Sequence, residues 1–156
     1  HAPSDAARPL RRALPIPGGV LGDSEAATEY LLRSGGSVLV DGYNVAKLGW
    51  PGLELERQRA VLLDALENLV RRLGCDLTVV FDGADVVGAT ADRRRVVRVV
   101  YSPAGVLADD VIRDEVDRLP AARPVVVVTN DRQIVTDVRA KGANTLSSDQ
   151  LLTQLR

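Results

Sequence analysis

Apolar residues in this chain are grouped into short continuous runs, and three of these runs end next to a carboxylate. The runs are 38–40, 78–81 and 125–128, and the carboxylates that follow them are Asp41, Asp82 and Asp131. Continuous runs of aliphatic residues are typical of strands that are buried on both faces of a parallel sheet. Because ligands of such sheets bind at the carboxyl ends of the strands, we expect these side chains to gather at one edge.

Between the runs, apolar residues recur with helical spacing. Leucines and Val70 follow this spacing along 54–73, and Gly74 is placed to end that helix. Further helices are predicted for 24–33, 107–119, 131–141 and 148 onward, the last with a capping-box pattern at Ser147. Weaker strands are expected at 96–101 and 144–146, and loops at 46–53 and 82–95. Strands that alternate with helices predict an α/β fold whose parallel sheet is covered on both faces.

The length and composition of the chain predict a single domain, and its cysteine content predicts a reducing compartment. The chain has 156 residues, of which 46% are hydrophobic and 3% aromatic. Its formal charge of -1 argues neither for nor against a polyanionic partner. Cys75 is the only cysteine, which excludes an internal disulfide. No apolar run approaches the length of a membrane span. We therefore expect a cytoplasmic protein with no membrane partner.

The N-terminal residues differ in composition from the rest. Residues 1–22 are rich in Pro, Ala, Arg and Gly and are predicted to be a flexible arm or linker. Residues 23–156 are predicted to form the single domain. The chain contains no methionine, even at its first position, so we expect a piece of a longer chain or a processed product. His1 is interpreted as a tag remnant or a disordered end, not as a metal ligand.

A fourth carboxylate comes from the helix predicted at 107–119. On a helix, Asp109 shares a face with Ile112 and Val116, whereas Asp110 lies on the opposite face with Asp114. Asp109 is therefore predicted to point inward and Asp110 toward water. Because an ionised group on the packed side of a helix costs free energy, Asp109 is a candidate for function.

Clustered carboxylates repel one another, and a divalent cation removes that cost. Oxygen ligands without nearby His or Cys favour Mg²⁺ or Mn²⁺ over zinc, and such ions serve phosphodiester hydrolysis. The sequence thus predicts four residues as both metal ligands and catalytic groups: Asp41, Asp82, Asp109 and Asp131. The alternative for each is a turn or a helix cap, and Asp131 is expected to cap a helix in either case. His1 is the only histidine, which excludes triads that use histidine as the base.

The ordered set of motifs resembles the NYN domains of the PIN-like nuclease superfamily. The most similar branch is the bacterial YacP-like one, which includes a ribosome-associated endoribonuclease. The motifs are Asp41-Gly42-Tyr43-Asn44, Phe81-Asp82-Gly83, Ala108-Asp109 with Ile112, and Thr129-Asn130-Asp131. The resemblance covers about residue 38 to the C-terminus. It implies a three-layer α/β/α, Rossmann-like fold with a central parallel sheet, and cleavage of RNA that depends on Mg²⁺ or Mn²⁺.

The resemblance also implies roles for two neighbours of the acidic set. Asn44 would be a polar orienting group beside Asp41, and Thr129 would bond the neighbouring carboxylate or a substrate phosphate. Asn130 stands where the family often has Ser, which changes the hydrogen bonding near the last carboxylate. Members of the superfamily also include proteins that keep the fold and lose activity.

Basic and aromatic residues suggest contacts with RNA. Arg93, Arg94 and Arg95 are candidates to hold the RNA backbone, or else form a solvated run of charges. Trp50 and Tyr43 are candidate platforms on which bases stack, and Tyr43 could instead pack beneath the site.

These observations favour a metal-dependent endoribonuclease that acts on RNA, such as mRNA on the ribosome, rRNA or tRNA. The alternative is a catalytically silent RNA- or ribosome-binding module of the same fold. A nucleotide-binding Rossmann protein is disfavoured because no glycine-rich phosphate loop follows the first strand. A toxin of the PIN class remains an analogy of fold alone. The oligomeric state is not predicted.

Overall fold

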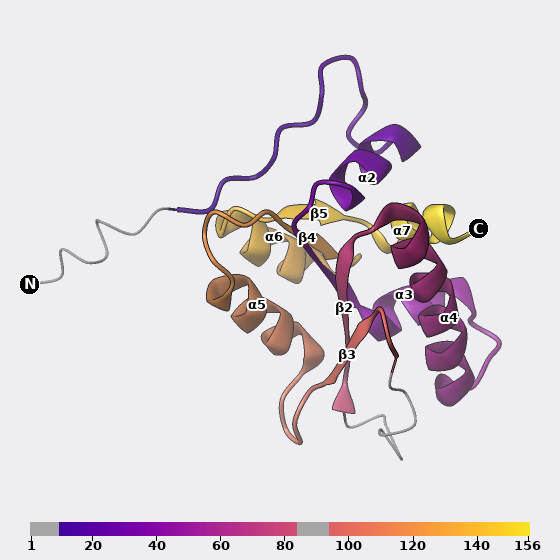
Figure 1. Ribbon diagram of the computed structural model, residues 1–156. Helices are drawn as coiled ribbons and strands as arrows, with labels where there is room; N and C mark the ends of the chain where they lie inside the picture. The colour runs from indigo at the N-terminus through magenta and orange to yellow at the C-terminus, as the bar shows by residue number, and fades with distance from the viewer. Residues whose placement is uncertain (1–9, 84–93) are drawn as a thin grey trace, which may run out of the picture.

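The computed structural model describes residues 10–83 and 94–156. Within these residues, five parallel strands form one sheet in the order β3-β2-β1-β4-β5 (Figure 1). The strands are β1 (Ser37–Asp41), β2 (Asp76–Phe81), β3 (Arg98–Tyr101), β4 (Val125–Val128) and β5 (Asn144–Leu146). The central parallel sheet expected from the sequence is confirmed.

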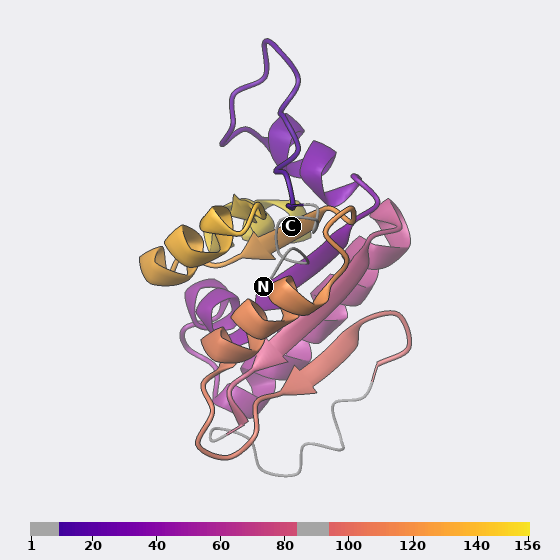
Figure 2. The same cartoon turned by 90° about the vertical axis from the view of Figure 1, so that its left-hand side faces the viewer.

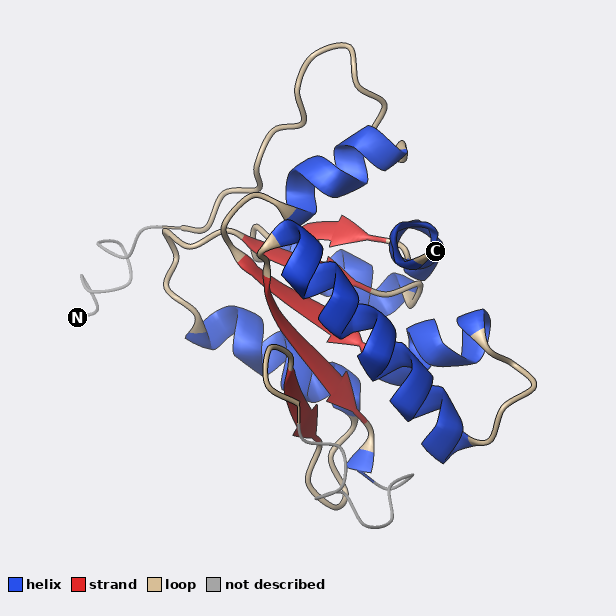
Figure 3. Cartoon of the chain, turned by 45° about the vertical axis from the view of Figure 1, so that its right-hand side comes forward, coloured by secondary structure: helices blue, strands red, loops and turns tan. Residues whose placement is uncertain are grey.

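Helices cover both faces of this sheet. The described helices are α2 (Glu25–Leu32), α3 (Gly42–Gly49), α4 (Leu55–Leu73), α5 (Ala108–Arg118), α6 (Arg132–Ala140) and α7 (Ser148–Leu155). The apolar residues of α2, α3, α4 and α7 share one core with the sheet, and those of α5 and α6 share the other. Figure 3 shows α4 in front of the strands and α5 behind them. The fold is therefore a layered α/β fold, as predicted.

Alternation along the strands supplies both cores. Val38 and Val40 of β1 pack toward α4, whereas Leu39 packs toward α5 and α6. In β4, Val126 and Val127 divide in the same way. Full burial of each such side chain contributes about 1.5–3 kcal/mol, so the central strands need apolar residues at every position.

Helix ends follow the local signals in the sequence. Ser24 caps α2 through a bond from the Ala27 amide, and Gly74 ends α4 with a left-handed φ of 71°. Ser147 and Gln150 form the predicted capping box at the start of α7.

Two predictions of local structure were wrong in detail. Residues 46–53 were expected to be a loop, but α3 runs to Gly49 and leaves only a short connection around Trp50. Helix α3 has little propensity of its own and is stabilised by burial of Tyr43, Val45 and Ala46 in the core. The strand predicted at 96–101 begins at Arg98. Of the loop predicted at 82–95, residues 84–93 lie outside the described part.

The first described residues contact the amino edge of the sheet. The Arg11 guanidinium donates hydrogen bonds to backbone carbonyls after and within the last turn of α5, those of Val116, Leu119, Pro120 and Arg123. The Leu14 amide donates to Asn144 Oδ1, and Asn144 Nδ2 donates back to the Leu14 carbonyl. These bonds place the segment beside the edge strand β5, and Figure 2 shows the chain then rising away from the sheet before it enters α2. The domain boundary at residue 22 stays a prediction.

The described helices include none that is long and apolar enough to cross a membrane.

Candidate functional site: an acidic pocket at the switch point of the sheet

The sheet order reverses between β1 and β4, and the candidate site lies at this point. From β1 the chain continues to β2 and β3 on one side, and β4 and β5 are added on the other. Asp41 ends β1, and Thr129, Asn130 and Asp131 directly follow β4. Ligands of open α/β sheets bind in the crevice outside the strand ends at such a switch point.

Asp41 occupies the boundary between β1 and α3. Its backbone is the N-cap of α3, but its side chain makes no capping bond. Asp41 lies two residues after Leu39 on the same strand, so its side chain points to the same sheet face, which α5 and α6 cover. The next residue must be glycine because no side chain fits there. A Cβ at Gly42 would lie only 2.4 Å from Phe81 Cε1. The Asp-Gly pair therefore lets the chain turn tightly against β2.

Thr129 connects two of the carboxylates. Its buried hydroxyl donates to Asp41 Oδ2 at 2.9 Å and accepts the Asp131 backbone N–H at 3.0 Å. The contact predicted between Thr129 and a neighbouring carboxylate is thus present. One hydroxyl fixes both the Asp41 side chain and the backbone from which Asp131 projects.

All four predicted carboxylates line one pocket of about 400 Å³. Its other lining residues come from α3, from the start of α5 and from α6: Tyr43, Asn44, Lys47, Leu107, Ala108 and Ile134. The N-termini of α3, α5 and α6 all adjoin this pocket. Their partial positive charges reduce the repulsion among the carboxylates without cancelling it.

This crowding perturbs Asp41. The pKa of the Asp41 carboxyl is raised from its usual 3.8 to about 6, mainly by burial and also by the charges of Asp131 and Asp109, while the Thr129 hydrogen bond acts in the opposite direction. A carboxyl group that resists ionisation in a pocket of other acids is a common mark of a functional site.

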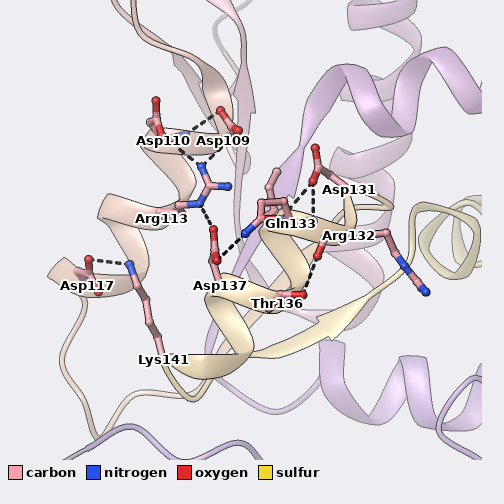
Figure 4. A network of polar contacts seen from close by, with 11 residues as sticks. Asp109, Asp110, Arg113, Asp117, Asp131, Arg132, Gln133, Thr136, Asp137 and Lys141 are labelled. Atoms are coloured by element: carbon pink, nitrogen blue, oxygen red, sulfur yellow. Dashed lines mark hydrogen bonds and ion pairs between the residues drawn. The ribbon is translucent and has the colours of Figure 1, made fainter.

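Asp109 is anchored by an arginine that the sequence analysis did not identify. Arg113 lies one turn along α5 and forms ion pairs with Asp109 at 3.2 Å, Asp110 at 3.2 Å and Asp137 of α6 at 2.8 Å (Figure 4). The Asp109 side chain is 27% exposed and that of Asp110 is 57% exposed. The predicted inward orientation of Asp109 is therefore confirmed, and Arg113 holds α5 against α6.

Asp131 is a helix cap, as predicted. Its Oδ1 accepts the backbone N–H groups of Gln133 and Ile134 at the start of α6. Both bonds use the same oxygen, and the residue is exposed. Asp82 follows β2, and the turn after it is held by a hydrogen bond from the Gly83 amide to Ser102 Oγ at 2.9 Å.

The pocket combines features that favour and features that disfavour a divalent metal ion. Their chemistry fits Mg²⁺ or Mn²⁺, because the pocket offers carboxylate oxygens and neither His nor Cys. The pKa of Asp41 is raised by burial first and by the charges of Asp131 and Asp109 second, and a bound cation would favour the ionised carboxylate against both effects. Within the described residues, however, no three acidic, His or Cys side chains are close enough together to hold a metal ion. The donor set therefore suits the ion, and its spacing is looser than that of a formed metal site.

The predicted polar and aromatic contacts are distributed differently. Asn44 lines the pocket, but its Oδ1 accepts the Asn130 amide and the Ser148 hydroxyl, so it ties α3 to the start of α6 and to α7. Tyr43 is buried, its ring centroid 5.0 Å from that of Phe81, and its hydroxyl accepts a bond from Arg59. Of the two roles considered for Tyr43, the structure favours packing beneath the site.

Trp50, Arg94 and Arg95, the other described residues that were predicted to contact RNA bases or backbone through stacking or charge, do not line this pocket. Trp50 is half-buried against the core beside α4. Arg94 forms ion pairs with Asp64 and Glu67 of α4, and Arg95 is exposed. Arg93 lies outside the described residues.

Lys47 is a pocket residue that the sequence analysis missed. Its Nζ lies 5.2 Å from the centroid of the Tyr43 ring, one helical turn away. The spacing of Tyr43, Asn44 and Lys47 would have placed all three on one face of a helix, but this segment was not predicted to be helical. Lys47 brings a positive charge to a pocket lined by carboxylates.

Comparison with known proteins agrees with this fold. Two solved structures of Rae1 (YacP) from Bacillus subtilis are similar to the chain. One has 25% sequence identity and a TM-score of 0.66, covering 76% of this chain and 72% of that one. A tryptophan-to-leucine mutant of the same protein has 24% identity and a TM-score of 0.64, covering 77% and 74%. No curated protein matches the chain. The family model of the YacP-like NYN domain matches residues 38–156, so the chain belongs to the YacP-like NYN domain family.

Proposed function

We propose that this protein is a metal-dependent endoribonuclease that hydrolyses RNA phosphodiester bonds at the acidic pocket. The observation that carries the proposal is the convergence of Asp41, Asp82, Asp109 and Asp131 on one pocket at the switch point of the sheet. Membership of a nuclease-type, RNA-acting family supports RNA as the substrate. The RNA is proposed to be cytoplasmic, such as mRNA on the ribosome, rRNA or tRNA.

The four aspartates are the proposed ligands of Mg²⁺ or Mn²⁺. When bound, the ion would neutralise the carboxylates, polarise the scissile phosphate and activate water for attack on phosphorus. Asp41 is the central ligand in this proposal, because burial already disfavours its charge and a cation would restore it.

Other residues in and around the pocket orient the carboxylates and enclose the substrate. Thr129 fixes the Asp41 carboxylate through its hydroxyl, and Arg113 fixes Asp109. Lys47 is placed to attract a phosphate into a pocket whose own charge is negative. Leu107 and Ile134 supply apolar walls that limit water around the reacting phosphate.

A catalytically silent RNA- or ribosome-binding module is the second candidate. The ion pairs of Arg113 favour it, because an arginine that neutralises Asp109 performs part of the task of a cation. The loose spacing of the described acidic groups points the same way.

One experiment separates the two candidates. Labelled RNA is incubated with Mn²⁺, with Mn²⁺ plus EDTA, and with Asp41→Asn or the control Asp114→Asn. Asp114 is an exposed residue of α5 that lies outside the pocket. An endoribonuclease gives cleavage that EDTA and Asp41→Asn abolish and Asp114→Asn leaves unchanged. Binding without cleavage under all conditions favours the silent module, and cleavage that survives EDTA overturns the metal mechanism.

A further inference from the structure

A second groove begins where the acidic pocket ends. It has a volume of about 300 Å³ and lies over the ends of β4 and β5, between the start of α6 and the start of α7. Thr129 lines this groove, and the same Thr129 hydroxyl donates to Asp41 in the acidic pocket. The two hollows are therefore neighbours, and the Thr129 side chain lies between them. A chain molecule whose scissile group sits at Asp41 can continue into the groove.

Helix α6 separates two kinds of surface. On one side, Gln133 and Asp137 join the network around Arg113 (Figure 4). On the other side, Arg132, Val135 and Arg139 line the groove at helical positions i, i+3 and i+7. Figure 4 shows the Arg132 guanidinium directed away from the network. Seven residues of helix place the two arginines roughly 10 Å apart along the axis.

These two arginines lack the acidic partners that several other cations of the protein have. Arg33, Arg98, Arg113, Arg118, Arg123 and Lys141 each lie within 4 Å of a carboxylate. In the described ranges, neither Arg132 nor Arg139 forms an ion pair. The Arg139 Nε donates to Thr145 Oγ1 at 2.8 Å, which holds its guanidinium at the rim of the groove. Unneutralised, partly oriented guanidinium groups are suited to phosphate.

The remaining lining of the groove fits a nucleotide chain. Asn130, Ser147 and Gln150 form a polar wall whose side chains are held in place by hydrogen bonds within the protein, and Val135 and Leu146 provide an apolar floor for sugar or base. The narrow volume suits a single extended strand, whereas a folded protein partner would need a broader and flatter surface.

We propose that the groove lined by Arg132 and Arg139 binds the phosphate backbone of the RNA strand that extends beyond the acidic pocket. This inference rests on the proposed function, because the strand enters the groove from the scissile phosphate. Arg132, nearer to Thr129, contacts the phosphate closer to the cut, and Arg139 contacts a more distant one. The groove thus fixes the path of the strand. On that side of the cleavage site, the RNA must be long enough to reach Arg132 and Arg139.

The test measures binding without chemistry. A fluorescein-labelled oligouridylate of about 12 nucleotides is titrated in EDTA over about 50–200 mM KCl, with wild-type protein and with the double variant Arg132→Gln/Arg139→Gln. Each phosphate contact on single-stranded RNA contributes about 0.7 to the slope of log affinity against log salt. The double variant is expected to lower the slope by about 1.4 and to weaken binding at least tenfold at the lowest salt.

Two controls separate a phosphate groove from general charge loss. Arg57→Gln makes the same kind of charge change on an exposed residue of α4, across the sheet, and is expected to bind as wild type does. Arg132→Lys/Arg139→Lys keeps both charges and is expected to keep most of the salt slope. An unchanged slope in the double Gln variant overturns the proposal, and so does an equal loss in Arg57→Gln. Cleavage by the wild type with Mn²⁺ is scored separately, so failure of the nuclease and failure of the groove give different results.

Discussion

Charged groups are paired at the amino edge of the sheet and crowded with like charges at the carboxyl edge. At the amino edge, Arg123 donates to Ser37 Oγ and to the Asp76 carboxylate, and Arg11 donates to four backbone carbonyls. At the carboxyl edge, Asp41, Asp109 and Asp131 lie around one pocket. Of these three, Asp109 alone has an arginine partner in the described part of the chain.

The difference separates an edge that stabilises the fold from the edge that carries the proposed site. Matched hydrogen bonds at the amino edge satisfy the carbonyl end of α5 and bind the N-terminal segment to the domain. Crowded carboxylates at the carboxyl edge cost stability, and a protein retains such a cost where a ligand will offset it. Substitutions at the two edges should therefore have opposite consequences.

The largest effect is expected on activity at the carboxyl edge. Asp109→Asn removes a proposed metal ligand and also the partner of Arg113, and we expect cleavage of RNA with Mn²⁺ to fall by about 10²–10³-fold, or roughly 3–4 kcal/mol. Asp110→Asn, its exposed neighbour, is the matched control and should keep activity within about twofold. Initial rates on a labelled RNA measure both. Equal losses in the two variants would place the effect in α5 packing and not in the pocket.

At the amino edge the effect is on stability instead. Arg11→Ala leaves several backbone carbonyls without their donor, and we expect the free energy of unfolding to fall by about 2–3 kcal/mol. Arg12→Ala, an exposed residue beside it, should change this free energy by no more than about 0.5 kcal/mol. Urea denaturation followed by circular dichroism measures both. A loss of activity without a loss of stability in Arg11→Ala would contradict the assignment of this edge to folding.

The comparison also explains what the sequence could predict. Buried strands and helix caps are written in local patterns, so β2 and the Ser147 capping box were predicted correctly. The convergence of the aspartates followed from the parallel sheet, because every parallel strand ends on the same side. Contacts made by single residues across the fold have no such pattern. The sequence therefore placed Arg11 in a flexible arm or linker and gave no sign of its partners, which lie more than 100 residues away.

The site was incompletely predicted for a related reason. Helix α3 begins and ends with glycine and owes its stability to burial, so propensity gave no sign of it. Without that helix, Lys47 had no predicted orientation. The role of Arg113 was missed because it depends on an ion pair with Asp137, a residue of another helix. Asp82, in contrast, was placed correctly in the pocket from its position after a strand.

A smaller effect is expected on the pH dependence of stability, which tests the contrast between the edges at Asp41. The folded pKa of Asp41, about 6, lies above its usual 3.8, so between these values the folded protein binds more protons than the unfolded one. Rising pH through this window therefore lowers stability. Asp41→Asn removes that loss, and above pH 6 the metal-free variant should be more stable by about 1–2 kcal/mol, after allowance for partial solvent screening. Below about pH 4 the advantage should vanish.

Thermal or urea unfolding across pH, in EDTA, measures this effect. Asp76→Asn is the control from the amino edge, because Asp76 accepts a hydrogen bond from Arg123 and its loss should destabilise slightly at neutral pH. If Asp41→Asn were less stable than wild type at pH 8, the carboxylate would be stabilising and the contrast between the edges would fail at its central residue.

The smallest effect concerns the two lysines of the chain, which belong to opposite edges. Lys141 forms an ion pair with Asp117 near the amino edge, whereas Lys47 lines the acidic pocket. If Lys47 attracts the substrate phosphate, Lys47→Gln should raise KM for RNA about three- to fivefold, or roughly 1 kcal/mol, with kcat within about twofold. Lys141→Gln should leave both constants unchanged. An unaltered KM in Lys47→Gln would limit Lys47 to its contact with the Tyr43 ring, because a charge that meets the substrate cannot be removed without weakening its capture.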